Sequence, residues 1–177
     1  TISAYYQGKP KVAENAPWDG GFVWEQDSLG NAFIATANQG LGASVWWPNK
    51  DHQSAEPDSM SINITLPSEI KNVSNGRLRD TTQHDNGMTT WSWFVSNPIN
   101  NYNIAVNAGN YVNFKDTYEG ENDTLDLSYW VLEQNLAKAK KQFQQVKPMM
   151  QCFEDWFGPY PFYEDSFKLV ETPHLGM

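Results

Sequence analysis

Up to about residue 131, the chain consists of short runs of β-branched and aromatic residues separated by Gly, Asn, Asp and Pro. This pattern is typical of an all-β sandwich. In "MSINITL" apolar residues alternate with polar ones, which predicts a strand with one buried face made by Met60, Ile62, Ile64 and Leu66. The runs expected to form strands are "TISAYY", "GFVWEQ", "AFIATA", "ASVWW", "SMSINITLP", "GRLRDTTQ", "MTTWSWFVS", "YNIAVNAG", "YVNFKDTYE" and "TLDLSYWV".

A turn signal lies between two of these runs. Asn86-Gly87 separates "GRLRDTTQ" from "MTTWSWFVS". The dipeptide is typical of a two-residue turn with positive φ at both central positions. We therefore expect residues 77–95 to form a β-hairpin.

After Trp130 the apolar period changes from two residues to about 3.6, which predicts a helix. The residues that recur at this spacing are Leu132, Leu136, Ala139, Phe143, Val146 and Met150. Pro148 should kink or restart the helix, and Gly158-Pro159 should end it. Four lysines are spread around it and indicate a solvated outer face: Lys138, Lys140, Lys141 and Lys147.

The run "SFKLVET" returns to strand character, and Pro173 closes it. A solitary strand has no partner for its hydrogen bonds, so this part reads as an unfinished α+β domain. The sequence predicts a mainly β chain with a saddle-like antiparallel β-sandwich over residues 1–131. A helix and the first strand of an α+β domain follow over residues 132–177. Both domains are expected to be truncated, because the chain starts and stops abruptly.

Composition limits the classes of partner. The chain of 177 residues has a formal net charge of -9 and a pI near 4.7, which argues against nucleic acid and anionic membranes, because both attract clustered Lys and Arg. Eight Trp, eight Tyr and nine Phe supply enough apolar surface for a core. No run of 18 apolar residues and no leader pattern occurs in this sequence.

The sequence contains few residues suited to metal binding or nucleophilic catalysis. Cys152 is the one cysteine and falls in the helical pattern, which indicates a packed core thiol. No two histidines have the i, i+4 spacing of a helical zinc site, and no nucleophile elbow, P-loop or dinucleotide fingerprint occurs. The histidines are His52, His84 and His174, and the Asn-x-Ser/Thr sequons, common by chance in an Asn-rich chain, are Asn63, Asn72 and Asn122.

The stretch "NQGLGASVWWPNKDH" is less ordinary. Gly40 and Gly42 allow the backbone to bend or to approach another group closely. Gln39 carries both an acceptor oxygen and donor protons, which could bind a terminal ammonium or a neighbouring strand. From the residues alone, a structural role is favoured. Trp46 and Trp47 are expected to point to opposite faces of a strand, one inward and one outward.

Three segments together resemble the aminopeptidase N family of zinc metallopeptidases, the gluzincins. "WFGPYPFYEDSFKLVETPHLGM" is similar to the opening of the family's catalytic domain, where a G-P-Y-P turn leads into a strand and then into the exopeptidase motif G-x-M-E-N. "WWPNKDHQSAEPDSMSINITLPSEI" and "SNPINNYNIAVNAGNY" resemble segments of the family's sandwich domain. Their order along the chain makes the resemblance specific.

The resemblance implies a function for the longer protein. Met177 would precede a glutamate that holds the substrate's α-ammonium, and H-E-x-x-H with a second glutamate would follow and bind zinc. Such a protein hydrolyses the N-terminal peptide bond of peptides. This chain would lack the zinc site, bind no cofactor itself and be inactive, and the rest of the catalytic domain would be its partner.

Residues of this chain also acquire expected roles from the resemblance. Gln39 falls where the family's sandwich domain sends a Gln or Glu to the substrate amino terminus. Gly176 and Met177 would line the substrate cleft. Leu175 departs from the first glycine of G-x-M-E-N, so the backbone there differs from the usual pattern.

Two other classes of function remain open. An acidic, Trp- and Asn-rich sandwich could be a carbohydrate-binding module whose exposed aromatic rings stack on sugars. This reading leaves the helix and "GPYPFYED" unexplained. A non-catalytic homologue that keeps the architecture for protein contacts is the third possibility.

Overall fold

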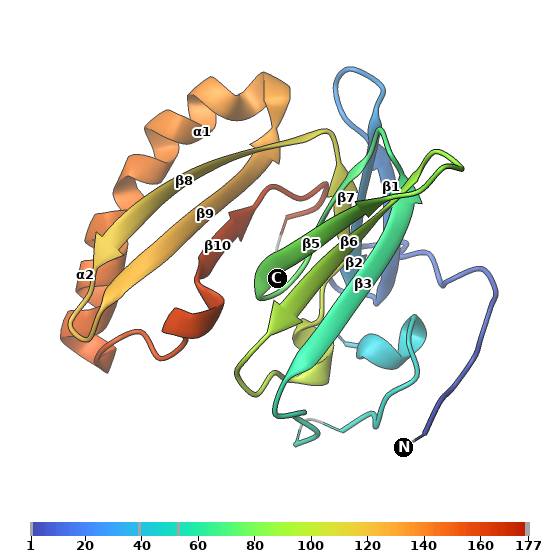
Figure 1. The fold of residues 1–177 in the computed structure, drawn as a ribbon, viewed down its shortest axis with the longest axis horizontal. Helices are drawn as coiled ribbons and strands as arrows, with labels where there is room; N and C mark the ends of the chain where they lie inside the picture. Colours follow the sequence, from blue (N-terminus) through green and yellow to red (C-terminus); the bar gives the residue numbers. More distant parts are fainter. Residues whose placement is uncertain (1, 39, 53, 176–177) are drawn as a thin grey trace.

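The molecule is built around three β-sheets, and a computed structural model describes it over residues 2–38, 40–52 and 54–175 (Figure 1). The four-stranded sheet is antiparallel, with the order β1 (Gly21–Gln26), β2 (Ala32–Ala37), β7 (Asn107–Gly109) and β4 (Lys71–Val73). The β6 sheet is also antiparallel, with the order β3 (Met60–Pro67), β6 (Met88–Val95) and β5 (Arg77–Gln83). The β9 sheet has the order β10 (Phe167–Val170), β9 (Thr124–Leu132) and β8 (Tyr111–Glu119). The mainly β fold class is confirmed.

Helices connect β9 to β10 and cover the outer face of the β9 sheet (Figure 1). They are a 3₁₀ turn (Glu133–Asn135), α1 (Leu136–Gln142), a second 3₁₀ turn (Phe143–Gln145) and α2 (Val146–Phe157). This crossover allows β10 to pair in parallel with β9, from Phe167 opposite Leu127 to Val170 opposite Trp130. The expectation of a strand without a partner was therefore wrong.

The core has two parts that meet at β9. One lies between the sheets, and its buried members are Phe33, Ile62, Val73, Trp93, Val95, Ile104, Tyr111, Trp130 and Leu132. The other lies between the β9 sheet and α2, and its buried members are Tyr118, Leu125, Leu127, Tyr129, Val146 and Met150. The last four residues of β9 are all buried, so its two faces serve the two parts of the core.

Most of the predicted strands are confirmed, including the buried alternation of β3, where Ile62 is buried and Ser61 and Asn63 are exposed. Three predictions were wrong. Residues 2–6 of "TISAYY" form no strand and stay exposed, "ASVWW" contains a 3₁₀ helix (Ala43–Val45), and only the end of "YNIAVNAG" is a strand. The short strand β4 was not predicted. Its Asn72, a sequon residue, is fully buried and accepts a hydrogen bond from the Trp93 indole at 3.0 Å.

The predicted hairpin is β5–β6, but its turn differs from the expectation. His84 N–H donates to the Met88 carbonyl at 2.9 Å, and Gly87 N–H donates to the His84 carbonyl at 3.2 Å. Among the described non-glycine residues only Ser166 has positive φ, so Asn86 does not, whereas Gly87 has φ 78°. The connection is a three-residue turn with glycine in the left-handed position.

The helix restarts near Pro148 and ends before Gly158, as predicted from the sequence. Pro148 lies in the first turn of α2, where its missing N–H costs no helical hydrogen bond, and Gly158 follows the last residue with φ 87°. Lys138, Lys140, Lys141 and Lys147 are exposed, as expected. Within the described chain no helix is long and apolar enough to cross a membrane.

Cys152 is exposed, so the expected core thiol was wrong. The buried line of α2 runs through Val146, Met150 and Glu154 at a spacing of four residues. Cys152 comes two residues after Met150 and therefore faces away from the sheet. A buried glutamate occupies the position that an apolar residue would normally take.

Candidate substrate-binding site

All three residues predicted to contact substrate, Gln39, Gly176 and Met177, lie outside the described residues. The chain on either side of Gln39 and the chain before Gly176 are described. Their anchoring shows where these two stretches run in the fold.

The residue before Gln39 is firmly held. Asn38 follows β2, is only 9% exposed, and donates from its side-chain amide to the carbonyls of Tyr102 at 2.8 Å and Ile104 at 3.0 Å. Its amide oxygen accepts from the Trp46 indole at 3.1 Å. The Gly42 N–H donates to the Asn38 carbonyl at 2.8 Å and closes a short loop over residues 38–42.

Both glycines of this loop are required by the backbone. Gly40 has φ 82°, and a Cβ there would lie 3.0 Å from the carbonyl oxygen of Trp18. Gly42 has φ 77°, and a Cβ there would lie 2.7 Å from Oδ1 of Asp51. The close approach predicted for these glycines is therefore to other parts of the chain.

Glu171 fixes the segment that leads towards Gly176. Its N–H donates to the Trp130 carbonyl, and its carboxylate accepts from the Leu132 N–H at 2.9 Å and the Asn135 amide at 2.7 Å. Its carbonyl accepts from the Tyr111 hydroxyl at 2.8 Å. Burial, together with the negative charge of Glu171, raises the pKa of Tyr111 well above its ordinary value. The chain past β10 therefore has a defined direction.

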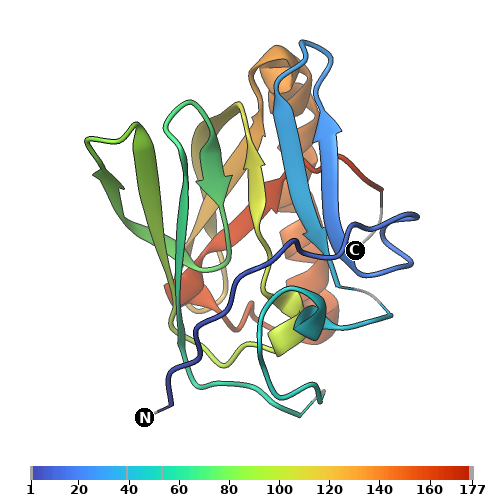
Figure 2. The same cartoon turned by 90° about the vertical axis from the view of Figure 1, so that its right-hand side faces the viewer.

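The two stretches meet at one segment, residues 13–20, which precedes β1. Gly40 packs against the Trp18 carbonyl, and Leu41 packs against Gly20. His174 and its neighbours on either side line a cavity of about 570 Å³ together with residues 13–18. Figure 2 shows the red C-terminal segment descending beside the blue strands β1 and β2 towards this part of the chain.

The prediction for the tryptophan pair was wrong. Trp46 and Trp47 follow the 3₁₀ helix instead of lying in a strand, and both are half-buried against the core between the sheets. The Trp46 ring also stands edge-on to Phe22 at 5.9 Å. Neither ring is the outward platform that sugar stacking requires.

The histidines do not form a metal site within the described chain. His84 lies within hydrogen-bond distance of Thr90, and His52 of Ser54. Nowhere in residues 2–38, 40–52 and 54–175 do three His, Cys, Asp or Glu side chains come together so as to hold a metal ion.

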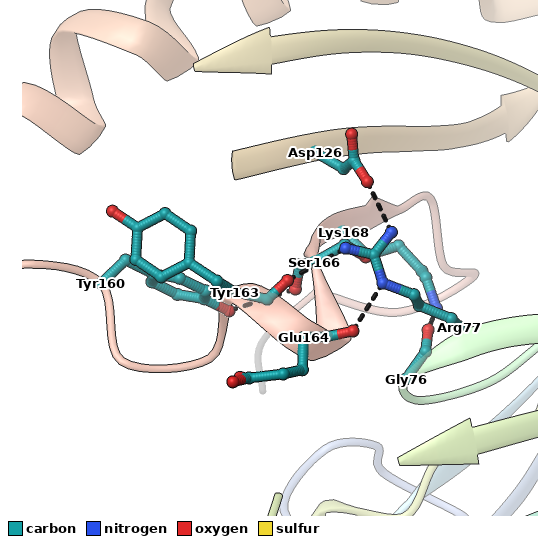
Figure 3. Close-up of polar contacts among 8 residues, drawn as sticks. All are labelled: Gly76, Arg77, Asp126, Tyr160, Tyr163, Glu164, Ser166 and Lys168. Atoms are coloured by element: carbon teal, nitrogen blue, oxygen red, sulfur yellow. Dashed lines mark hydrogen bonds and ion pairs between the residues drawn. The ribbon is translucent and has the colours of Figure 1, made fainter. Parts of the chain in front are cut away.

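Sequence reasoning missed a polar junction that fixes residues 163–165, just after the G-P-Y-P turn, and β10 to the sandwich (Figure 3). The Arg77 guanidinium pairs with the Asp126 carboxylate at 2.6 Å and donates to the carbonyls of Tyr163 and Glu164. The Asp165 carboxylate accepts from backbone N–H groups of the loop after β6. Burial raises the pKa of Asp165, but these hydrogen bonds outweigh it and the pKa is lowered.

Lys168, on β10, is the most unusual group at this junction. Its ammonium donates to the carbonyls of Ser74 and Gly76, both at 2.6 Å. Figure 3 shows the contact with Gly76. Burial lowers the pKa of Lys168 to about 7. Its place in the strand-like run "SFKLVET" was visible in the sequence, but its carbonyl partners are about ninety residues away. The junction holds the strand that leads towards Gly176.

Comparison with solved structures shows which known proteins have a similar fold. An M1 zinc metallopeptidase from Deinococcus radiodurans superposes with a TM-score of 0.74 at 17% identity, over 96% of this chain and 38% of that one. A two-domain M1 zinc metallopeptidase mutant bound to L-tryptophan gives a TM-score of 0.75 with the same identity and coverage. Legionella pneumophila aminopeptidase A with aspartic acid gives 0.67 at 18% identity, over 86% of this chain and 18% of that one.

The similarity is one of fold. No protein-family model and no curated protein matches the chain. The chain has the fold of part of the M1 zinc metallopeptidases and spans less than two-fifths of the length of these solved structures. The resemblance stated from the sequence motifs is confirmed at this level.

Proposed function

We propose that this chain is the sandwich domain and the first part of the catalytic domain of a zinc aminopeptidase, divided near residue 131. The longer protein removes N-terminal residues from peptides. Gln39 accepts a hydrogen bond from the substrate's α-ammonium, and Gly176 and Met177 line the cleft beside it. The chain by itself binds the amino terminus weakly and hydrolyses nothing.

One observation carries the proposal. The loop that holds Gln39 and the segment that leads to Gly176 border the same stretch, residues 13–20, although they are far apart in sequence. The amide oxygen of a glutamine is a hydrogen-bond acceptor that suits a small cationic group. The shared fold with zinc metallopeptidases supports the same assignment.

Zinc belongs to the rest of the proposed protein. The resemblance to the aminopeptidase N family places the zinc ligands, H-E-x-x-H and a second glutamate, after Met177. When bound, the metal would polarise the scissile carbonyl and activate water. The residues of this chain would act before that step, by orienting the substrate's amino end.

The exposed face of α2 has the character of a surface on which another part of the protein packs. Phe153, Trp156 and Phe157 are 50%, 79% and 84% exposed and lie at helical spacing near its end. Large neighbouring aromatic side chains on a surface mark an interaction site. We assign this face to the remainder of the catalytic domain.

The binding role is tested with leucine amide and N-acetyl-leucine amide, followed by NMR. The acetyl group removes the ammonium, so the native chain should bind the free amide more tightly, and Gln39→Ala should abolish the difference. Gln83→Ala, at an exposed position of β5, is the matched control and should retain it. Equal binding of the two ligands, or zinc-dependent hydrolysis of an aminoacyl-anilide by the chain, would refute the proposal.

Carbohydrate binding is the second candidate, since other tryptophans are exposed. Trp24 is 52% exposed and stacks on Phe22 at 5.4 Å, which makes a flat aromatic surface on β1. Oligosaccharides that shift the Trp24 indole resonance, with no response to leucine amide, would favour this function.

A further inference from the structure

The cavity between residues 13–18 and the C-terminal segment has a chemical character of its own. Its volume is about 570 Å³, and Glu14, Trp18 and Glu25 line it from one side. Pro173, His174 and Leu175 line it from the other. It therefore combines two carboxylates with an aromatic ring, directly before the residues assigned to the substrate cleft.

The two carboxylates are not neutralised within the described chain. The side chains of Glu14 and Glu25 make no hydrogen bond and no ion pair with any described residue. The cation close in sequence, Lys11, is already engaged: its ammonium lies 3.6 Å from Asp19 and donates to the Gly20 carbonyl at 3.0 Å. The cavity is therefore lined by two carboxylates that can pair with a bound cation.

The wall that carries Trp18 is preorganised. The Asp19 carboxylate accepts from the N–H groups of Glu14 at 2.7 Å and Asn15 at 2.8 Å, and the Trp18 N–H donates to the Asn15 carbonyl at 3.0 Å. The Trp18 side chain is nevertheless 68% exposed. A ring held on a fixed loop in this way can bind a cation on its face at little entropic cost.

The opposite wall adds no positive charge that would repel a cation. Burial lowers the pKa of His174, which favours its uncharged imidazole. Its Nδ1 is buried without a hydrogen-bond partner among the described residues. Pro173 and Leu175 are apolar and can pack against an aliphatic stem.

We propose that this cavity is a specificity subsite for the cationic side chain of a peptide, arginine or lysine. The guanidinium or ammonium would pair with Glu14 and Glu25 and lie over Trp18, while the aliphatic stem packs on Pro173 and Leu175. The assignment rests on the proposed function, because it places the substrate's amino terminus at the neighbouring Gln39 loop.

The test compares arginine amide with citrulline amide, its neutral isostere, by NMR titration of the chain. We expect arginine amide to bind about fivefold more tightly, as for partly exposed ion pairs combined with a cation–π contact. The double variant Glu14→Gln/Glu25→Gln should bind the two ligands within about twofold. The control Glu69→Gln/Glu121→Gln removes the same charge from exposed positions elsewhere and should retain the preference.

N-acetyl-arginine amide separates this inference from the proposed function. If arginine and citrulline amides bind equally while acetylation still weakens binding, the subsite is wrong and the amino-terminus site stands. If acetylation has no effect while the arginine preference is lost in the Glu14/Glu25 variant, the subsite stands and the role of Gln39 is wrong. A preference that the control variant also loses reflects net charge and overturns the subsite.

Discussion

The ammonium nitrogen of Lys168 lies 4.2 Å from the centroid of the Trp93 ring, so a strand of the β9 sheet is joined to the β6 sheet through a buried cation. The same group donates to two backbone carbonyls, of Ser74 and Gly76. A neutral amine keeps two N–H donors and can serve both carbonyls after losing its proton. The joint between the sheets is therefore compatible with the lowered pKa of Lys168.

Lys168 should make stability rise with pH. Its folded pKa is about 7, whereas a lysine in an unfolded chain has a pKa near 10.4. Between these values the unfolded state binds more protons than the folded state, so unfolding becomes less favourable as pH rises. Relative to Lys168→Met, the native chain should gain about 2 kcal/mol in unfolding free energy between about pH 7 and 9, measured with urea. The control is Lys138→Met, at an exposed helix position, and its difference in unfolding free energy from the native chain should not change with pH. If the difference between Lys168→Met and the native chain is also independent of pH, the lowered pKa of Lys168 is wrong.

Tyr118→Phe should destabilise the contact between α2 and the β8–β9 hairpin. The Tyr118 hydroxyl donates at 2.7 Å to Glu154, which is only 4% exposed. Removing a donor to a buried carboxylate should cost about 1–3 kcal/mol at neutral pH. Tyr5→Phe, at a site 96% exposed, should cost nothing measurable.

The cost of Tyr118→Phe should also depend on pH. Burial raises the pKa of Glu154, but the hydrogen bond from Tyr118 and those from backbone N–H groups outweigh it and lower the pKa. A lowered pKa stabilises the fold above the unfolded value, and this contribution is lost as pH falls through the folded pKa. The difference between native and variant chains should therefore shrink in acid, and a constant difference would speak against this role for Glu154.

Gly42→Ala should destabilise the loop that carries Gln39. Both Gly42 and Gly30 have positive φ, but a Cβ meets Asp51 at 2.7 Å only at Gly42, while nothing lies within 4 Å at Gly30. Gly30→Ala therefore measures the conformational cost alone, about 1 kcal/mol. Gly42→Ala should exceed it by only about 0.5–1 kcal/mol, because the exposed Asp51 carboxylate can turn away and loses its hydrogen bond from the Ser44 hydroxyl. Equal losses in thermal unfolding would show that the contact with Asp51 has no energetic effect.

Trp156→Gln should leave stability almost unchanged and reduce self-association. The Trp156 side chain is 79% exposed on α2, so its removal should alter the unfolding free energy by less than about 0.5 kcal/mol. Met150→Ala, on the buried face of the same helix, should cost about 2–5 kcal/mol. Sedimentation would detect the change in association, and a large loss of stability in Trp156→Gln would show that the face already packs within this chain.

The spacing of apolar residues correctly predicted the strands and helices that have one apolar and one polar face. The alternation in β3 and the helical spacing of Val146 and Met150 gave the correct elements and the correct buried faces. Strand-like composition alone misled at "TISAYY" and "ASVWW", because no neighbouring strand offers hydrogen bonds there. Whether such a segment forms a strand depends on a neighbouring strand to pair with, and that neighbour is remote in sequence.

The candidate site was predictable only in part. Gln39, Gly176 and Met177 stay predictions from motif order, and the anchoring of their neighbours by Asn38 and Glu171 became visible only in the fold. The wall of Glu14, Trp18 and Glu25 gave no sequence signal, because these residues are brought together with residues 173–175 by the tertiary fold. Charge and aromatic content alone could not indicate such a cavity.

The most direct test of the aminopeptidase assignment is to read the parent gene past the codon for Met177. The account predicts a glutamate as the next residue, followed downstream by H-E-x-x-H and a later glutamate that complete a zinc site. A stop codon, or a continuation without those ligands, would contradict it and leave a non-catalytic protein with the same fold.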